Sequence, residues 1–122
     1  MTAPRLGAHL SVAGGVPRAI DRAVATGCET FQIFTKNSNR WQGRALAETE
    51  VEEFRRLARA HAFDSIVSHA SYLINLAAPD LALRRRSVAA LEDELHRGDQ
   101  LGLSGVVLHP GAHTTATRRR EG

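Results

Sequence analysis

Short apolar segments and helix-like segments alternate along most of this 122-residue chain. Runs rich in apolar or β-branched residues are typical of strands, and there are four: 5–11, 30–34, 65–68 and 105–109. Three helical patterns separate them. Because a strand–helix–strand connection is right-handed and makes its two strands parallel, the alternation predicts an α/β fold around one parallel sheet. The strands should follow one another in chain order, with the helices on one face.

The ends and the buried faces of the three helices can also be predicted. The first should run from Pro17 to Gly27, because proline suits a first helical turn and glycine a helix end. Thr49 and Glu52 match a capping box for the second helix. Pro79 and Asp80 should open the third, which should end near Gly102. Helical spacing predicts these buried stripes: Val51, Phe54, Leu57 and Ala58 in the second helix, and Leu81, Val88, Leu91 and Leu95 in the third. The acidic residues of both helices are expected to face solvent: Glu48, Glu50, Glu52, Glu53, Glu92, Asp93 and Glu94.

Composition excludes several classes of protein. A hydrophobic content of 43% suits a soluble globular domain. The single cysteine, Cys28, cannot form an internal disulfide and fits a reducing compartment. No apolar run reaches the roughly 20 residues of a membrane span, so we expect a cytoplasmic protein without a membrane partner. The net charge of +3 falls to +1 without residues 118–122, which hold three Arg and one Glu, so global charge says little about partners.

Polar residues gather where the predicted strands end, and sites in parallel α/β folds form beyond these carboxyl ends. They are His9 and Ser11, then Thr35, Lys36 and Asn37, then His69, Ser71 and Tyr72, and finally His109 and His113. A single histidine at a strand end is more often a hydrogen-bonded structural residue. Four on one rim favour a metal site, because neutral imidazole is a preferred ligand of zinc and related ions.

Four motifs, in order, closely resemble the N-terminal half of the endonuclease IV family: GAHLSVAGG, FQIFTKNSNRW, SHASYLINLA and LGLSGVVLHPGAHT. The resemblance covers residues 5–114. It implies a TIM (β/α)8 barrel with three zinc ions at its carboxyl rim. It also implies hydrolysis of double-stranded DNA on the 5′ side of an abasic site.

Carried over by position, the resemblance gives roles to the histidines. His69 and His109 match two ligands of one zinc ion, His9 matches a residue lining the site, and His113 matches a phosphate or outer contact. No strand exit in the sequence carries Asp or Glu, so we expect at most one partial zinc site in this chain.

The resemblance also predicts two DNA-facing loops. Tyr72 and Leu73 match residues that wedge into the distorted duplex, with packing inside the loop as the alternative. Lys36, Asn37 and Arg40 match phosphate or gap-filling contacts, although Arg40 could be a solvated charge. Trp41 is expected to pack.

The length implies an incomplete barrel, since a (β/α)8 barrel typically needs about 250 residues. We interpret residues 1–114 as four β/α units that lack the last helix, and 115–122 as a divergent basic tail from truncation or a frameshift. A genuine DNA-binding tail is the alternative. Two further functions stay open: a non-catalytic half-barrel that binds metal or DNA and oligomerises through exposed sheet edges, and a fragment of a sugar-isomerase-like barrel.

Overall fold

The computed structural model describes residues 3–113, and these fold into alternating strands and helices. The elements are β1 (Gly7–His9), α1 (Pro17–Thr26), β2 (Thr30–Ile33), α2 (Glu48–Ala60), β3 (Ile66–His69), α3 (Leu81–Leu101) and β4 (Gly105–Val107). The predicted alternation is confirmed, with shorter strands than expected at both ends of the sequence. The predicted boundary between residues 114 and 115 lies outside the described residues.

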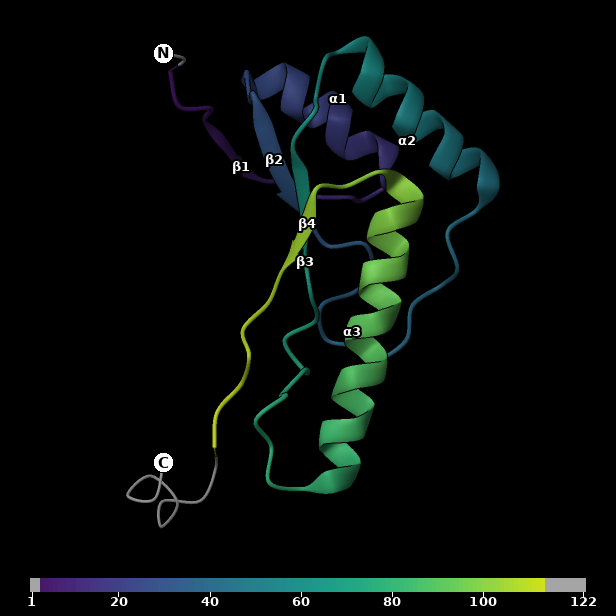
Figure 1. Cartoon of the computed structure of the whole chain (residues 1–122). Coiled ribbons are helices and arrows are strands. Elements are labelled where there is room, and N and C mark those ends of the chain that lie inside the picture. Colours follow the sequence, from purple (N-terminus) through teal and green to yellow (C-terminus); the bar gives the residue numbers. More distant parts are fainter. Residues whose placement is uncertain (1–2, 114–122) are drawn as a thin grey trace.

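The strands form one parallel sheet in the order β1-β2-β3-β4. Phe31 of β2 pairs with Ala8 on one side and with Ile66 on the other. Figure 1 shows all three helices on one side of this sheet, while no helix or strand of residues 3–113 covers the other side. This arrangement agrees with the predicted fold class, in which four β/α units of a TIM barrel carry their helices on the outer face.

The main hydrophobic core lies between the sheet and the helices α1 and α2. Ile20, Phe31, Ile33 and Phe54 are almost completely buried there. The predicted stripe of α2 is confirmed, because Phe54 and Ala58 are buried and Val51 and Leu57 pack partly against the same cluster.

The predicted buried face of α3 is wrong for three of its four residues, and only Leu91 packs partly against a core cluster. Leu81, Val88 and Leu95 are 48%, 45% and 51% exposed. The buried face instead carries mainly small and polar residues: Ser87, Ala90, Glu94, Arg97, Gly98 and Leu101. The expectation that the acidic residues all face solvent is also wrong, because Glu94 is 1% exposed. This helix packs against the polar loop after β2, and Glu94 and Arg97 reach that loop by hydrogen bonds.

The helix ends agree with the sequence in two of three cases. The Asp80 side chain accepts a hydrogen bond from the backbone N–H of Leu83 at 2.8 Å, so it caps α3. Helices α1 and α3 end at Gly27 and Gly102, both with the positive φ of 74° that favours glycine. The capping box expected for α2 is wrong: the helix begins at Glu48, after Ala47, with no side-chain cap.

The face of the sheet opposite the helices carries several of the candidate site residues. Side chains alternate along a strand, so His9, Gln32 and His69 point away from the helices, and His9 and Gln32 contact each other there. Both edges carry exposed apolar side chains, with Leu6 72% and Val107 42% exposed. Within residues 3–113 no helix has the length and apolar character needed to cross a membrane.

Candidate metal centre and nucleic-acid interface

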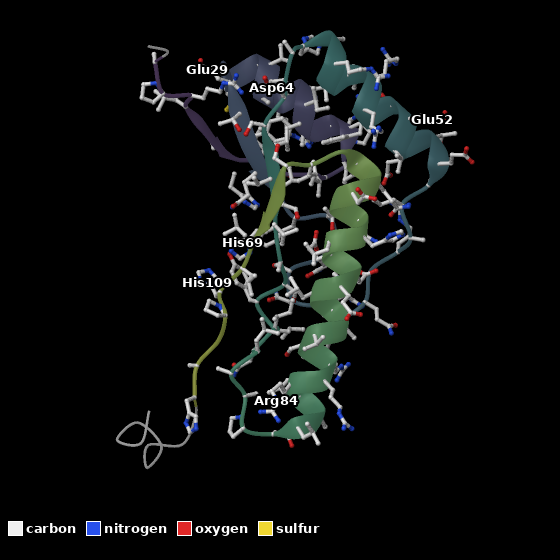
Figure 2. The ribbon with its side chains drawn as sticks, viewed as in Figure 1. Glu29, Glu52, Asp64, His69, Arg84 and His109 are labelled. Atoms are coloured by element: carbon white, nitrogen blue, oxygen red, sulfur yellow. The ribbon has the colours of Figure 1, made fainter. Side chains whose placement is uncertain are left out.

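Three histidines meet through aromatic contacts at the carboxyl ends of the strands. The ring of Phe34 lies 4.6 Å from that of His9 and 5.4 Å from that of His69, between centroids. The ring of His109 lies 5.1 Å from that of His69. Tyr72 completes the group, 5.2 Å from His69 and 6.1 Å from His109. The prediction that His9, His69 and His109 share one rim is confirmed, and Figure 2 shows His69 beside His109.

His69 has a fixed tautomer. Its Nδ1 lies 2.6 Å from the backbone oxygen of Ala70, and because a carbonyl oxygen only accepts, Nδ1 must donate. The Nε2 lone pair of a neutral His69 is therefore available. Histidines that bind metals usually donate their second ring N–H to a carbonyl or carboxylate in this way. His69 could therefore bind a metal ion through Nε2, with the imidazole of His109 5.1 Å away between ring centroids.

His9 is oriented differently. The side-chain amide of Gln32 donates to Nδ1 of His9 at 2.8 Å, so a neutral His9 carries its proton on Nε2. Burial lowers the pKa of His9, and repulsion from His69 lowers it further. A neutral ring that offers an N–H suits contact with a phosphate or water better than it suits metal binding.

The described residues bring together a pair of potential metal ligands rather than a complete set. Between residues 3 and 113, no group of three or more His, Cys, Asp or Glu side chains is placed to hold a metal ion. His113 is exposed in the loop after His109, which also contains Pro110 and Gly111. The sequence prediction of separate roles for His109 and His113 remains a prediction.

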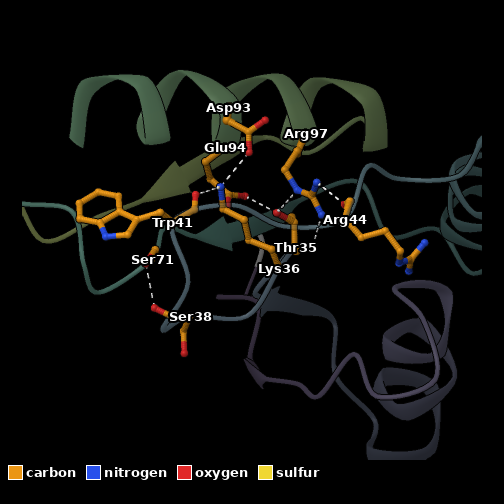
Figure 3. A network of polar contacts seen from close by, with 9 residues as sticks. All are labelled: Thr35, Lys36, Ser38, Trp41, Arg44, Ser71, Asp93, Glu94 and Arg97. Atoms are coloured by element: carbon orange, nitrogen blue, oxygen red, sulfur yellow. Dashed lines mark hydrogen bonds and ion pairs between the residues drawn. The ribbon is translucent and has the colours of Figure 1, made fainter. Parts of the chain in front are cut away.

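A buried polar network holds the loop after β2, residues 35–44, against α3 (Figure 3). The Thr35 hydroxyl donates to Glu94 Oε2 at 2.7 Å and accepts from Arg97 Nε at 2.9 Å. Arg97 also donates to the backbone oxygens of Thr35 and Arg44, the latter at 2.8 Å. Sequence reasoning missed this network; the one available signal was the presence of Glu94 and Arg97 on the same helix face as Ser87 and Ala90.

Lys36 also joins the loop after β2 to α3. Its Nζ donates to Asp93 Oδ2 at 2.7 Å and to the backbone oxygen of Trp41 at 3.3 Å, and its side chain is 3% exposed. The ammonium group is therefore turned toward α3. The expectation that Lys36 meets a DNA phosphate is not supported by this geometry. Trp41 packs as expected, with the Arg86 guanidinium 4.6 Å from its ring centroid.

The two loops predicted to face DNA are joined to each other at Ser38. Its backbone oxygen accepts from the Ser71 hydroxyl at 2.8 Å and from the Tyr72 N–H at 3.1 Å. Tyr72 is nevertheless 59% exposed, and Asn37 and Arg40 are exposed on the other loop. Asn37 and Arg40 also line a cavity of about 650 Å³ that reaches His9. Leu73 is only half-buried.

The comparisons agree with this geometry. A family model described as "Xylose isomerase-like TIM barrel" matches residues 20–122. A protein named "Probable endonuclease 4" from Trichlorobacter lovleyi is 46% identical over 110 residues, which make up 90% of this chain and 39% of that protein. The protein of the same name from Halorhodospira halophila is 46% identical over 113 residues, or 93% of this chain and 38% of that protein.

Solved structures give the same result. The crystal structure of endonuclease IV from Thermus thermophilus superposes with a TM-score of 0.86 and 46% identity, over 97% of this chain and 44% of that one. A more distant structure, AsfvAP:AG, has a TM-score of 0.72 at 18% identity and supports the fold alone. The chain spans less than half the length of these relatives. These relatives are named as endonucleases, whereas the description of the family model refers to the barrel shared with xylose isomerase. The chain belongs to the endonuclease IV family of TIM-barrel proteins, and it corresponds to the N-terminal part of its members.

Proposed function

We propose that this chain supplies the N-terminal part of a zinc-dependent site that cleaves DNA on the 5′ side of abasic sites. The observation that carries the proposal is the pair of His69 and His109, whose rings are 5.1 Å apart, beside the exposed ring of Tyr72. The relatives named endonuclease 4 support hydrolysis of DNA as the reaction.

The residues of this chain fit a zinc ion at that position. His69 and His109 would hold it, since the Nδ1 hydrogen bond of His69 leaves Nε2 free to bind. When bound, zinc supplies Lewis acidity and makes water a nucleophile near neutral pH. His9 would offer its Nε2–H to a phosphate oxygen nearby, and His113 would make an outer contact.

Recognition of DNA would depend on the two loops that meet at Ser38. Tyr72 and Leu73 would wedge into the duplex next to the metal, and separating a base step in this way favours bent or already weakened DNA. An abasic site is such a weak point, because no base stacks there. Asn37 and Arg40 would contact the backbone from the neighbouring loop. Of these four side chains, Tyr72 would lie nearest the metal pair, since its ring is 5.2 Å from that of His69.

The 122-residue chain alone should bind zinc weakly and should not incise DNA appreciably. Paired metal ions in phosphodiester hydrolysis need bridging ligands, and in the described part of the chain no carboxylate joins the two histidines. The uncovered sheet face makes an oligomerising, non-catalytic half-barrel the second candidate for this chain by itself.

Two assays on the same sample test the proposal. The chain is titrated against a duplex with one abasic analogue and against the intact duplex, by fluorescence anisotropy, with incision followed on a denaturing gel. We expect tighter binding to the abasic duplex, lost in Tyr72→Ala and kept in the control His96→Ala. Equal affinity for both duplexes would contradict the proposed recognition. Efficient, chelator-sensitive incision would contradict the expectation of an incomplete site.

A further inference from the structure

The loops that follow β3 and β4 are joined by the side chain of Asn75. Its Oδ1 accepts from the backbone N–H of Ala112 at 3.2 Å, and its Nδ2 donates to the backbone oxygen of the same residue at 3.2 Å. The same Oδ1 also accepts from the N–H of Ala77 at 3.1 Å, within its own loop. The donor and the acceptor of the Asn75 amide therefore both bond to the backbone of Ala112 in the other loop.

The second loop is shaped to receive this amide. Gly111 has a φ of +107°, and a Cβ placed there would lie 2.0 Å from Asn75 Oδ1 and 2.9 Å from Asn75 Cα. A side chain at residue 111 would therefore force the loops apart. One residue earlier, the backbone oxygen of Pro110 accepts from the N–H of Leu76 at 2.9 Å. This bridge between the two loops therefore consists of one backbone hydrogen bond and the two hydrogen bonds between the Asn75 side chain and Ala112.

Asn75 is itself fixed to the helix layer. Its backbone N–H donates to the Ser87 hydroxyl at 2.9 Å, and Ser87 is fully buried on α3. Since β4 ends at Val107, residues 108–113 lie beyond the sheet. The loop that carries His109 is therefore connected through Asn75 to a buried residue of the scaffold.

We propose that Asn75 is a positioning residue that holds His109 beside His69 and so sets the geometry of the two-histidine zinc site. The proposal rests on the proposed function, because it concerns the same metal centre. The segment bridged by Asn75 begins directly after His109, whereas His69 is held by the sheet. The separation of the two imidazoles thus depends on how the second loop docks on the first. Tyr72 lies on the loop of Asn75, so the same bridge aligns the metal pair with the DNA-reading side chain.

The chemistry requires an amide at this position. An aspartate side chain would still accept hydrogen bonds from the N–H groups of Ala77 and Ala112. It could not donate to the Ala112 backbone oxygen, so a carboxylate oxygen would face that carbonyl oxygen without a hydrogen between them. Leucine has a similar size and would lose all three hydrogen bonds. Removing partners that orient metal ligands typically costs 10–100-fold in metal affinity.

The test compares Asn75→Leu and Asn75→Asp with the wild-type chain in two measurements. Zinc affinity is measured by competition with a chromophoric chelator, and hydrogen exchange of the metal-free chain is followed in peptides that cover residues 108–113. We expect a loss of zinc affinity of about tenfold or more, together with faster exchange in this segment. The control is Thr30→Val, which removes a hydrogen bond to Ser65 far from the rim. This variant should lower stability without changing the zinc affinity or the exchange rate of residues 108–113.

The outcomes separate this inference from the proposed function. If His109→Ala binds zinc as tightly as the wild type, the zinc proposal fails. If His109→Ala loses affinity but both Asn75 variants retain it, the positioning role is overturned while the zinc site stands. Should the Asn75 variants fail to fold, Gly111→Ala provides a second disruption of the same bridge. Unchanged zinc affinity in a folded Gly111→Ala would also overturn the inference.

Discussion

The Glu94 carboxylate accepts a hydrogen bond from the Thr35 hydroxyl at 2.7 Å, in the buried contact between α3 and the loop after β2. Arg97 donates to the same hydroxyl, so one threonine connects an acidic and a basic side chain that are both almost fully buried. The loop that would face DNA is thereby attached to the scaffold at its first residue, before the exposed Asn37 and Arg40.

This network should contribute strongly to stability. Arg97→Met should lower the free energy of unfolding by about 3–5 kcal/mol, because the oxygens of Thr35 and Arg44 then lose their charged donor in a buried contact. The double variant with Glu94→Gln should recover part of the loss. Urea unfolding of the two single variants and the double variant gives the coupling. Strictly additive losses would show that the residues act independently.

Lys36 and Arg40 should behave as different kinds of basic residue. Asp93→Asn should reduce stability through its partner Lys36 and leave the salt dependence of DNA binding unchanged. Arg40→Ala should leave stability nearly unchanged and reduce the slope of log affinity against log salt by about 1, as the loss of one phosphate contact does. Anisotropy titrations at several salt concentrations measure these slopes. The interpretation of Lys36 would be wrong if Asp93→Asn altered the slope as much as Arg40→Ala.

The uncovered sheet face predicts self-association. Strands β1 and β4 are both edges of the described sheet, and Leu6 and Val107 expose apolar side chains beside unpaired backbone groups. We expect the 122-residue chain to sediment as an oligomer or to aggregate, and Val107→Lys to shift it toward the monomer. A compact monomer with one sharp thermal transition would contradict this prediction.

The ion pair of Arg5 and Asp64 predicts a pH effect at the opposite end of the sheet. The hydrogen bond from Arg5 lowers the pKa of Asp64 below its usual value of 3.8. A carboxyl with a depressed pKa in the folded state stabilises it above the unfolded pKa, and this contribution is lost as pH falls through the lower, folded value. Wild type and Asp64→Asn should therefore differ most above pH 4 and converge in stronger acid. Because both side chains are exposed, the difference should be small, and high salt should reduce it.

The sequence predicted the parts of the fold that depend on local periodicity. The stripe around Phe54, the stop at Gly102 and the parallel order all follow from spacing and from the handedness of strand–helix–strand connections. The rim of histidines followed as well, because the exits of parallel strands meet at one edge of the sheet.

The parts that could not be predicted depend on partners far along the chain. Leu81, Val88 and Leu95 have the spacing of a buried stripe, yet Glu94 and Arg97 occupy the interior because Thr35 and Arg44 supply hydrogen bonds there. Lys36 was predicted to contact DNA, but its ammonium group pairs with Asp93, 57 residues further along the chain. Polar residues in helices therefore need a tertiary partner before they can be placed.

Zinc titration of histidine variants tests the central claim most directly. The chain is titrated with zinc against a chromophoric chelator, alongside His69→Ala, His109→Ala and the control His61→Ala, which lies at the end of α2 away from the rim. The account predicts weak binding by the wild type and by His61→Ala, and its loss in both of the other variants. Zinc affinity that is unchanged in His69→Ala and His109→Ala would contradict it.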